Sequence, residues 1–272
     1  MFPLSMSPDQ ESNSAQDSRR QLNEAIESLY ATFAFPRRFG PVTGCHHCTS
    51  PDDDERLRSK PLRQLSGEDL KRFALKAMTT LGSVEDFKHF VPRLFEIAAF
   101  EGNVGYMDFE IVMGKLRYGE WARWPEIEQA AIKQYLNSLW EHKLSVFPCL
   151  PDVDSCLCGI GQAVDDLRPF LNAWQSKTSL PALRHLADFI EDNLRTMVDH
   201  QSLGNAFWPN AGQQMRQVAE WLLEPRLAAH LEKGFFACSV DPVATELAQA
   251  VDRLGWMRIA VGKAVDVSGN SQ

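Results

Sequence analysis

The sequence has no apolar run that approaches the ~18 residues needed to cross a bilayer. The first residues, MFPLSMSPDQESNSAQDSRR, have no basic region followed by an apolar core, so we do not expect a secretory signal. An excess of basic residues is also missing: 28 lysines and arginines stand against 36 aspartates and glutamates, which gives a net charge of −8 and a pI near 5.4. A surface built for nucleic-acid phosphates needs the opposite balance. We therefore expect a cytoplasmic protein whose partner is neither nucleic acid nor a membrane.

The sequence motifs of several enzyme classes are missing as well. There is no GxGxxG or Gly-Lys-Ser/Thr loop to hold phosphates, and no GxSxG turn to present a nucleophilic serine. A repeated ExxH pair, which a di-iron helical bundle requires, is not present either. The carboxylates in 86–90 and 188–193 fit solvated helix faces. An enzyme is therefore not the favoured interpretation.

Strand signals are scarce, and helical periodicity takes their place. Apolar residues recur at spacings of three and four, for example at Leu22, Ile26, Leu29 and Phe33, which lie on one face of a helix. About nine such amphipathic segments follow one another. They predict an all-α fold of antiparallel helix pairs, for which an irregular HEAT-like solenoid is the suggested arrangement.

Three local signals predict helix boundaries. Ser66 with Asp69, and Ser83 with Asp86, have the spacing of capping boxes, in which a hydroxyl and a carboxylate satisfy backbone N–H groups at a helix start. Pro92 falls inside the second helical pattern, so we expect a kink or a restart there.

The polar composition of the two ends predicts disordered tails over 1–17 and 263–272. Between them we expect a single helical domain, 18–262. Its best internal boundary is the Pro- and Cys-rich stretch FPCLPDVDSCLCG at 147–159.

A CxxC motif stands at Cys45 and Cys48, with His46 and His47 between the thiols. Two thiolates at this spacing can bind one zinc ion, and a histidine can add a third ligand. A second CxxC or HxxxH at a suitable spacing is missing, so the fourth ligand would be a distant residue.

Two other interpretations of this motif remain open. A redox pair requires a helix N-terminus behind a strand, and the preceding FGPVTG is a poor strand. The favoured interpretation is a tight turn, in which Gly44 permits an unusual backbone angle and Pro51 opens a short helix with the acidic run DDDE at its start. With six cysteines in 272 residues, a disulfide scaffold is not expected.

Aromatic residues are concentrated in one stretch. Tyr118, Trp121 and Trp124 lie close together with Arg123 among them, and Tyr135 and Trp140 follow. A core and helix-junction role is the favoured interpretation. An exposed subset would form a recognition patch, because Trp, Tyr and Arg are enriched at interaction hot spots.

Several blocks within residues 30–145 resemble a family of bacterial hypothetical proteins. The shared pattern is a GCxxC turn followed by KPLRxLS, KAxTT, DFKHFxPR and KLxYxxWxxWPxxEQ blocks. It is found here at Lys60–Leu65, Lys76–Thr80, Asp86–Phe90, Pro92–Arg93, Lys115–Leu116 and Trp121–Gln129. Phe73 and Val91 are mild departures from it.

The resemblance implies no activity for this chain. It implies that the CxxC turn and the DFKHF segment belong together, which makes His89 a candidate metal ligand beside Cys45 and Cys48. From charge and fold class we expect a non-enzymatic, adaptor or immunity-type protein that binds a protein, of basic character, through an acidic or aromatic surface. The alternative is a zinc-binding or thiol-redox protein centred on the CHHC turn.

Overall fold

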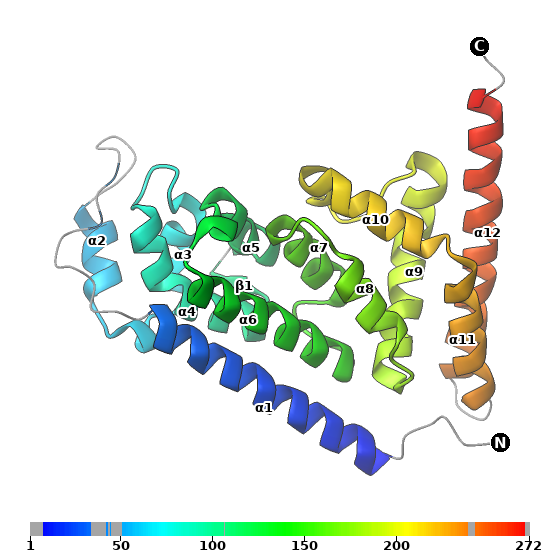
Figure 1. The fold of residues 1–272 in the computed structure, drawn as a ribbon, viewed down its shortest axis with the longest axis horizontal. Coiled ribbons are helices and arrows are strands. Elements are labelled where there is room, and N and C mark those ends of the chain that lie inside the picture. Colours follow the sequence, from blue (N-terminus) through cyan, green and yellow to red (C-terminus); the bar gives the residue numbers. More distant parts are fainter. Residues whose placement is uncertain are drawn as a thin grey trace. The chain divides into compact units, whose positions relative to one another are not determined.

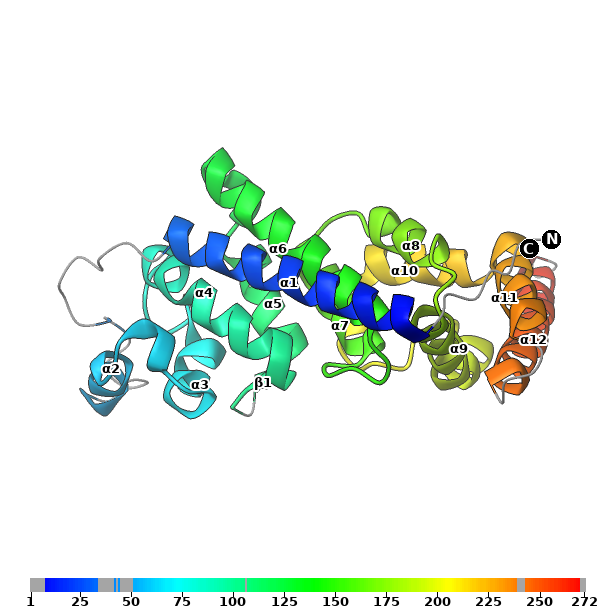
Figure 2. The ribbon, with the colours of Figure 1, turned by 90° about the horizontal axis from the view of Figure 1, so that it is seen from below.

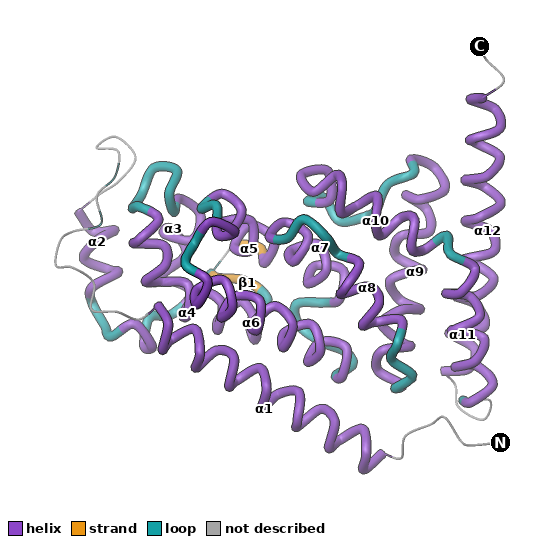
Figure 3. Tube along the Cα trace, viewed as in Figure 1, coloured by secondary structure: helices purple, strands orange, loops and turns teal. Residues whose placement is uncertain are grey.

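The computed structural model describes residues 8–33, 42, 44, 51–105, 107–238 and 243–269. It is 79% helical, with twelve α-helices and one two-stranded hairpin among the described residues (Figure 3). The predicted all-α class is therefore confirmed, whereas the HEAT-like arrangement stays a prediction. Within the same residues, no helix combines the length and the apolar character that a membrane crossing needs.

The helices are numbered along the chain (Figure 1). The first six are α1 (Pro8–Phe33), α2 (Pro51–Arg58), α3 (Gly67–Lys76), α4 (Val84–Glu101), α5 (Phe109–Tyr118) and α6 (Glu126–Ser145). The last six are α7 (Val153–Ala163), α8 (Arg168–Gln175), α9 (Leu180–His200), α10 (Gly212–Leu222), α11 (Pro225–Ala237) and α12 (Val243–Gly269). Short 3-10 turns are η1 (Leu62–Gln64), η2 (Trp121–Arg123) and η3 (Trp208–Ala211), and the hairpin pairs β1 (Asn103–Val104) with β2 (Met107–Asp108).

Twelve helices replace the expected nine because two patterns are interrupted and a short helix adds one. The helical periodicity of residues 155–175, one of the nine amphipathic segments, breaks at Val164, whose backbone is extended, into α7 and α8. The pattern over 212–234 breaks at Glu224, which is extended because it precedes Pro225. The third addition is α2, the short helix that was expected to open at Pro51.

Helices also reach into both segments for which tails were expected. The first helix begins at Pro8. The last helix continues to Gly269. In both cases the helix is longer than its stripe of regularly spaced apolar residues. Hydrophobic periodicity predicts a helix only over that stripe, so it does not predict the ends of these two helices.

Both capping boxes are confirmed. The hydroxyl of Ser66 accepts from Asp69 N–H and the carboxylate of Asp69 accepts from Ser66 N–H, and Ser83 with Asp86 repeats this arrangement at the start of α4. The expected restart at Pro92 is not found, because α4 continues through this residue, which is buried.

The chain folds into two compact units. Unit 2 comprises Asp17–His142 and Cys149–Val164, and unit 1 comprises Met1–Gln16, Lys143–Pro148 and Asp165–Gln272. The chain therefore changes unit several times between residues 142 and 165, a stretch that includes the expected boundary at 147–159.

Close helix packing characterises the core of unit 2. A Cβ at Gly159 of α7 would lie 2.4 Å from Cδ1 of Phe109 on α5, so only glycine allows the two helices to approach this closely. On the other side of the unit, Tyr30 Oη of α1 donates to Glu96 Oε2 of α4 at 2.6 Å. Tyr135 of α6 is fully buried, and its hydroxyl donates to the carbonyl of Phe95 at 2.9 Å.

Unit 1 is built around Trp174 of α8. Its ring centroid lies 5.4 Å from those of Phe189 and Trp221, and its Nε1 donates to the carbonyl of Ala182 at 3.0 Å. The helices α11 and α12 lie side by side in both views (Figures 1 and 2). On its other flank α12 contacts α9, where Glu246 accepts from Arg184 at 3.1 Å.

Candidate functional site

The CHHC turn lies outside the described residues, and so do its four members Cys45, His46, His47 and Cys48. Its start is described: Gly44 forms an isolated antiparallel bridge with Leu81, in the turn between α3 and α4. His89 is half-buried on α4, and its ring meets the Phe90 ring edge-on at 4.9 Å. In the part of the chain that is described, no group of three or more His, Cys, Asp or Glu residues is arranged to hold a metal. The zinc and thiol-redox interpretations stay predictions.

No disulfide joins the cysteines in the described part of the chain, Cys149, Cys156, Cys158 and Cys238. Cys156 and Cys158 are buried on α7, and burial raises the pKa of the Cys158 thiol well above its usual range, with the charge of Glu110 adding to the effect. A thiol that stays protonated is a poor nucleophile and a poor metal ligand, so Cys158 is a packing group.

Lys115 of α5 forms hydrogen bonds with the main chain at the end of α3, where the turn to α4 begins. Its Nζ is buried and donates to the carbonyls of Leu75 at 2.7 Å and Ala77 at 3.1 Å. Burial lowers the pKa of Lys115. The last carbonyls of a helix have no hydrogen-bond donor within the helix. The Lys115 ammonium therefore supplies donors to carbonyls at the C-terminal end of α3. Met78 follows in the left-handed region, with φ of 63°.

Trp121 and Trp124, two of the four candidate interaction residues, lie in the core. Trp121 Nε1 donates to the carbonyl of Ala163, and Trp124 Nε1 donates to the carbonyl of Gly119, both at 2.8 Å. Their exposed fractions are 7% and 6%. Trp121 thus attaches η2 to the end of α7 and cannot serve as a contact residue, which agrees with the favoured helix-junction role.

Two further side chains make bonds of the same kind. Gln129 Nε2 of α6 donates to the carbonyl of Trp124 at 2.7 Å, and Arg117 Nε of α5 donates to the carbonyl of Gln162 at 2.9 Å. We call the five donors the junction: Lys115, Arg117, Trp121, Trp124 and Gln129. Every acceptor of these bonds is a main-chain carbonyl, so the junction joins α3, α5, α6 and α7 through their backbones.

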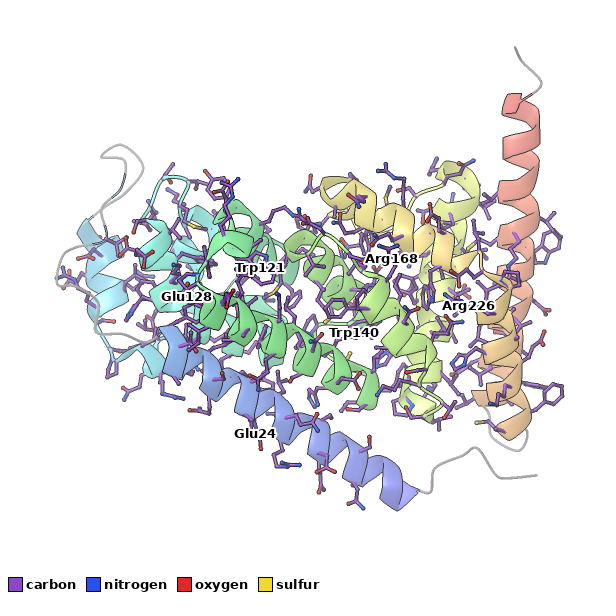
Figure 4. The ribbon with its side chains drawn as sticks, viewed as in Figure 1. Glu24, Trp121, Glu128, Trp140, Arg168 and Arg226 are labelled. Atoms are coloured by element: carbon purple, nitrogen blue, oxygen red, sulfur yellow. The ribbon has the colours of Figure 1, made fainter. Side chains whose placement is uncertain are left out.

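A salt bridge ties the start of α4 to the start of α6. Lys88 Nζ lies 3.0 Å from Glu128 Oε2 and 3.2 Å from Glu85 Oε1, and 4.9 Å from the centre of the Trp124 ring. Burial lowers the pKa of Lys88, but the hydrogen bonds and charges of Glu128 and Glu85 outweigh it and the pKa is raised. Figure 4 labels Glu128 near the start of α6 and Trp121 in η2.

Tyr118 and Arg123, the other two expected interaction residues, are exposed. Tyr118 is 58% exposed, and the Arg123 guanidinium lies 3.0 Å from Glu120. Ile127, at the start of α6, is 71% exposed and was not among the expected residues. We call the ends of α3, α4, α5 and α6 that meet around the junction the helix-end surface. Its exposed apolar side chains are Leu75, Val84, Tyr118 and Ile127.

A second group of exposed apolar residues lies in unit 1, on α11 and α12. Phe236 is 74% exposed, Trp256 68% and Ile259 54%. The helical register of α12 was a signal that could have located the last two. Leu247, Ala250, Leu254 and Met257 define its buried stripe, and Trp256 and Ile259 fall on another side of the helix.

Comparison with protein-family models, with curated proteins and with solved structures found no match for this chain. The fold and surface therefore define a class only: an all-α protein with exposed apolar side chains set around a bonded helix junction.

Proposed function

We propose that this chain is a non-enzymatic protein of the adaptor or immunity type that binds another protein through the helix-end surface of unit 2. The observation that carries the proposal is the pair of large, exposed side chains Tyr118 and Ile127, held on either side of the junction. Apolar and aromatic groups of this size, rimmed by polar residues, are typical of interaction surfaces.

The junction supports the proposal because it preorganises the surface. Lys115 fixes the end of α3, and the Trp121 and Gln129 bonds fix the course of the chain between α5 and α6. Tyr118 and Ile127 therefore project from backbone that is already ordered before a partner binds. A partner that docks on ordered backbone loses less conformational entropy, which increases affinity for a given contact area.

The charges around these two residues favour a basic partner. Glu85, Glu120 and Glu126 are exposed at the starts of α4, η2 and α6, whereas the exposed Arg123 is paired with Glu120 and the exposed Arg117 is bonded to the main-chain carbonyls of Gln162 and Val164. An acidic rim increases the rate of encounter with a basic surface and disfavours acidic competitors. The overall charge of −8 acts in the same direction.

The buried ionisable groups support a structural role more than a catalytic one. Tyr30 has a raised pKa because it is buried and bonded to Glu96, and Tyr135 because it is buried. Both hydroxyls, like the Lys115 ammonium, are engaged in bonds that join helices. Active sites bring such perturbed groups together around one reacting atom. Here each one serves a different contact.

The test is to compare binding by surface variants. We expect Ile127→Glu and Tyr118→Ala each to weaken the affinity for a captured protein partner by at least about tenfold, with an unchanged melting temperature. Val198→Glu, at a position on α9 in unit 1 that is 37% exposed, is the matched control and should bind normally. Binding that survives both surface variants but is lost in the control would contradict the proposal.

The zinc or thiol alternative keeps one supporting observation, the Gly44–Leu81 bridge, which fixes the start of the CHHC turn beside the turn that precedes α4. Cys45 and Cys48 would supply two thiolates, and His46, His47 or His89 would complete the ligand set. Metal content per chain decides this alternative, measured on protein purified without a metal-affinity tag. About one zinc per chain that is lost in Cys45→Ser would support it, whereas metal-free protein with all thiols titratable would reject it.

A further inference from the structure

The turn between α5 and η2 has its glycine next to the left-handed residue instead of at it. The sequence there is Tyr118, Gly119, Glu120, and the residue in the left-handed region is Glu120, with φ of 52°. Gly119 has φ of −81° and ψ of 7°, which are angles open to residues with a side chain. A helix end usually places its glycine at the left-handed residue. The backbone angles therefore do not explain why residue 119 is a glycine.

Close packing against Met78 does explain it. Gly119 is buried, and a Cβ at this position would lie 3.0 Å from Sδ and 3.4 Å from Cε of Met78. It would also lie 3.3 Å from the carbonyl oxygen of Lys115. The thioether of Met78 thus occupies the space that a side chain at residue 119 would need. Because Met78 comes from the turn between α3 and α4, this contact joins that turn to the turn after α5.

Met78 is itself in a strained conformation. Its φ of 63° lies in the left-handed region, where a residue with a Cβ is strained and glycine is not. The turn around it is well bonded, since Met78 N–H donates to the carbonyl of Leu81 at 3.0 Å and the carbonyl of Ala77 accepts from Lys115. Glycine would fit this backbone with less strain. A methionine at this position therefore retains a side chain in spite of the strain, and that side chain contacts Gly119.

The contact between Met78 and Gly119 lies directly beside Tyr118 in the chain. Tyr118 is 58% exposed, so few contacts of its own ring fix its direction, and the direction depends on the backbone that carries it. Lys115 Nζ, which is bonded to the end of α3, lies 5.8 Å from the centre of the Tyr118 ring. The end of α3 and the turn that follows it thus contact this part of α5 through Lys115 before Tyr118 and through Met78 after it.

We propose that Met78 is a positioning residue for the helix-end surface. Its thioether holds Gly119 against the turn between α3 and α4, and so sets the direction in which Tyr118 projects towards a partner. This role rests on the proposed function, because the direction of Tyr118 matters for binding only if a partner contacts it. It makes the turn between α3 and α4 a determinant of partner binding, although the contact of Met78 is made within the chain.

Met78→Gly separates the role of the side chain from that of the backbone, because glycine suits φ of 63° and only the thioether is lost. Protein labelled with 3-fluorotyrosine gives a fluorine NMR signal for each tyrosine ring, and Tyr118→Phe identifies the signal of Tyr118. The nitroxide TEMPOL, added as a soluble probe, measures how accessible that ring is. We expect Met78→Gly to shift the Tyr118 signal and its broadening by TEMPOL, with a melting temperature changed by only about 2–4 °C. Met78→Leu, which has a similar volume, should restore the signal.

Gly119→Ala tests the same contact from its other side. In the wild-type chain the added methyl group collides with the Met78 thioether, so the melting temperature should fall by about 2–4 °C. In the Met78→Gly chain the thioether is gone and the same substitution should cost less than half as much. An equal cost in both chains overturns the proposed contact.

Gln201→Gly is the matched control. Gln201 is also a residue other than glycine in the left-handed region, with φ of 49°, but it ends α9 in unit 1. Its replacement should leave the Tyr118 signal unchanged. A Tyr118 signal that does not move in Met78→Gly overturns the proposal.

The affinity for the protein partner separates this proposal from the proposed function. Met78→Gly should weaken binding at least about threefold, less than the loss in Tyr118→Ala, because the ring is displaced and not removed. If Tyr118→Ala and Ile127→Glu weaken binding but Met78→Gly does not, the role of Met78 is wrong and the proposed function stands. If Met78→Gly shifts the Tyr118 signal while none of the three variants changes binding, the contact is confirmed and the proposed function is wrong.

Discussion

Trp121 and Trp124 of unit 2 and Trp256 of unit 1 lie in opposite environments. In unit 2, Trp121 and Trp124 belong to a dense aromatic stretch, yet both rings are buried and both N–H groups donate to main-chain carbonyls. In unit 1, Trp256 stands apart from other aromatic residues in the sequence and is 68% exposed. A concentration of aromatic residues thus indicates a helix junction here, whereas the exposed tryptophan is recognised by its position off the buried stripe of its own helix.

The largest expected effect comes from truncating one tryptophan on each side of this comparison. Trp121→Ala should lower the free energy of unfolding by about 3–5 kcal/mol, because it creates a cavity and leaves the Ala163 carbonyl without its donor. Trp256→Ala should change it by less than about 0.5 kcal/mol. Urea unfolding curves of the two variants measure the difference. Similar losses of unfolding free energy in both variants would mean that the exposed fraction of a tryptophan does not distinguish a core role from a surface role.

A second comparison uses one glycine from each region. Gly159→Ala should lower the free energy of unfolding by about 1–3 kcal/mol, because the added methyl group collides with the Phe109 ring. Gly255→Ala meets open space on α12 and should raise it by up to about 1 kcal/mol, because alanine favours the helix. Thermal unfolding of dilute protein checks both signs. A destabilising Gly255→Ala would show that α12 is packed more closely than the exposure of Trp256 and Ile259 indicates.

The pH dependence of stability should reveal the capping box of α3. The hydrogen bond from Lys60, and those from Ser66, lower the pKa of Asp69 from 3.8 to about 2. Because the folded pKa lies below the unfolded one, this carboxylate stabilises the fold fully above pH 3.8 and the contribution is lost as the pH falls towards 2. Asp69→Asn should therefore cost about 1 kcal/mol near neutral pH, and the cost should shrink in that acidic range. Glu68→Gln, an exposed neighbour, is the control for the unfolding series.

The smallest effect has the opposite sign and lies in unit 1. Burial raises the pKa of Asp188 on α9 above 3.8, and the charges of Glu246 and Asp192 raise it further. The folded state then binds the proton more tightly than the unfolded state, so stability falls as the pH rises through the window just above 3.8. Asp188→Asn should raise the free energy of unfolding by a few tenths of a kcal/mol near neutral pH, because the carboxylate is only partly buried and solvent screens its charge, and should gain nothing below that window. A loss of stability in this variant would show that the carboxylate is held by favourable contacts.

Periodicity and caps were readable from the sequence because they depend on local geometry. The stripe of Leu22, Ile26, Leu29 and Phe33 is buried as predicted, and the hydroxyl–carboxylate pairs start α3 and α4. The end of a helix was harder to predict when it depended on one backbone angle, as at Val164. The apolar pattern continues across that residue, so it contains no signal for the break.

The candidate site was only partly predictable. Tyr118, Trp121, Arg123 and Trp124 were all candidate interaction residues, and nothing in the sequence separates the exposed Tyr118 and Arg123 from the buried Trp121 and Trp124. What separates them is the distant acceptor: the carbonyl of Ala163 lies 42 residues along the chain from Trp121. A single sequence does not show which carbonyl a buried indole will meet, because that contact exists only once α7 has packed beside α5.

The donors and the acceptors of the junction differ in how well they tolerate mutation. Its five side-chain donors must keep their identity, because a different side chain would not reach the same oxygen atoms. The acceptors are main-chain groups of Leu75, Ala77, Gly119, Gln162 and other residues, which any amino acid supplies. Substitution at the accepting positions therefore leaves the framework bonded, whereas substitution of Lys115, Trp121, Trp124 or Gln129 removes a bond. Tyr118 and Ile127 donate none of these bonds, so both side chains can change without loosening the framework that holds them.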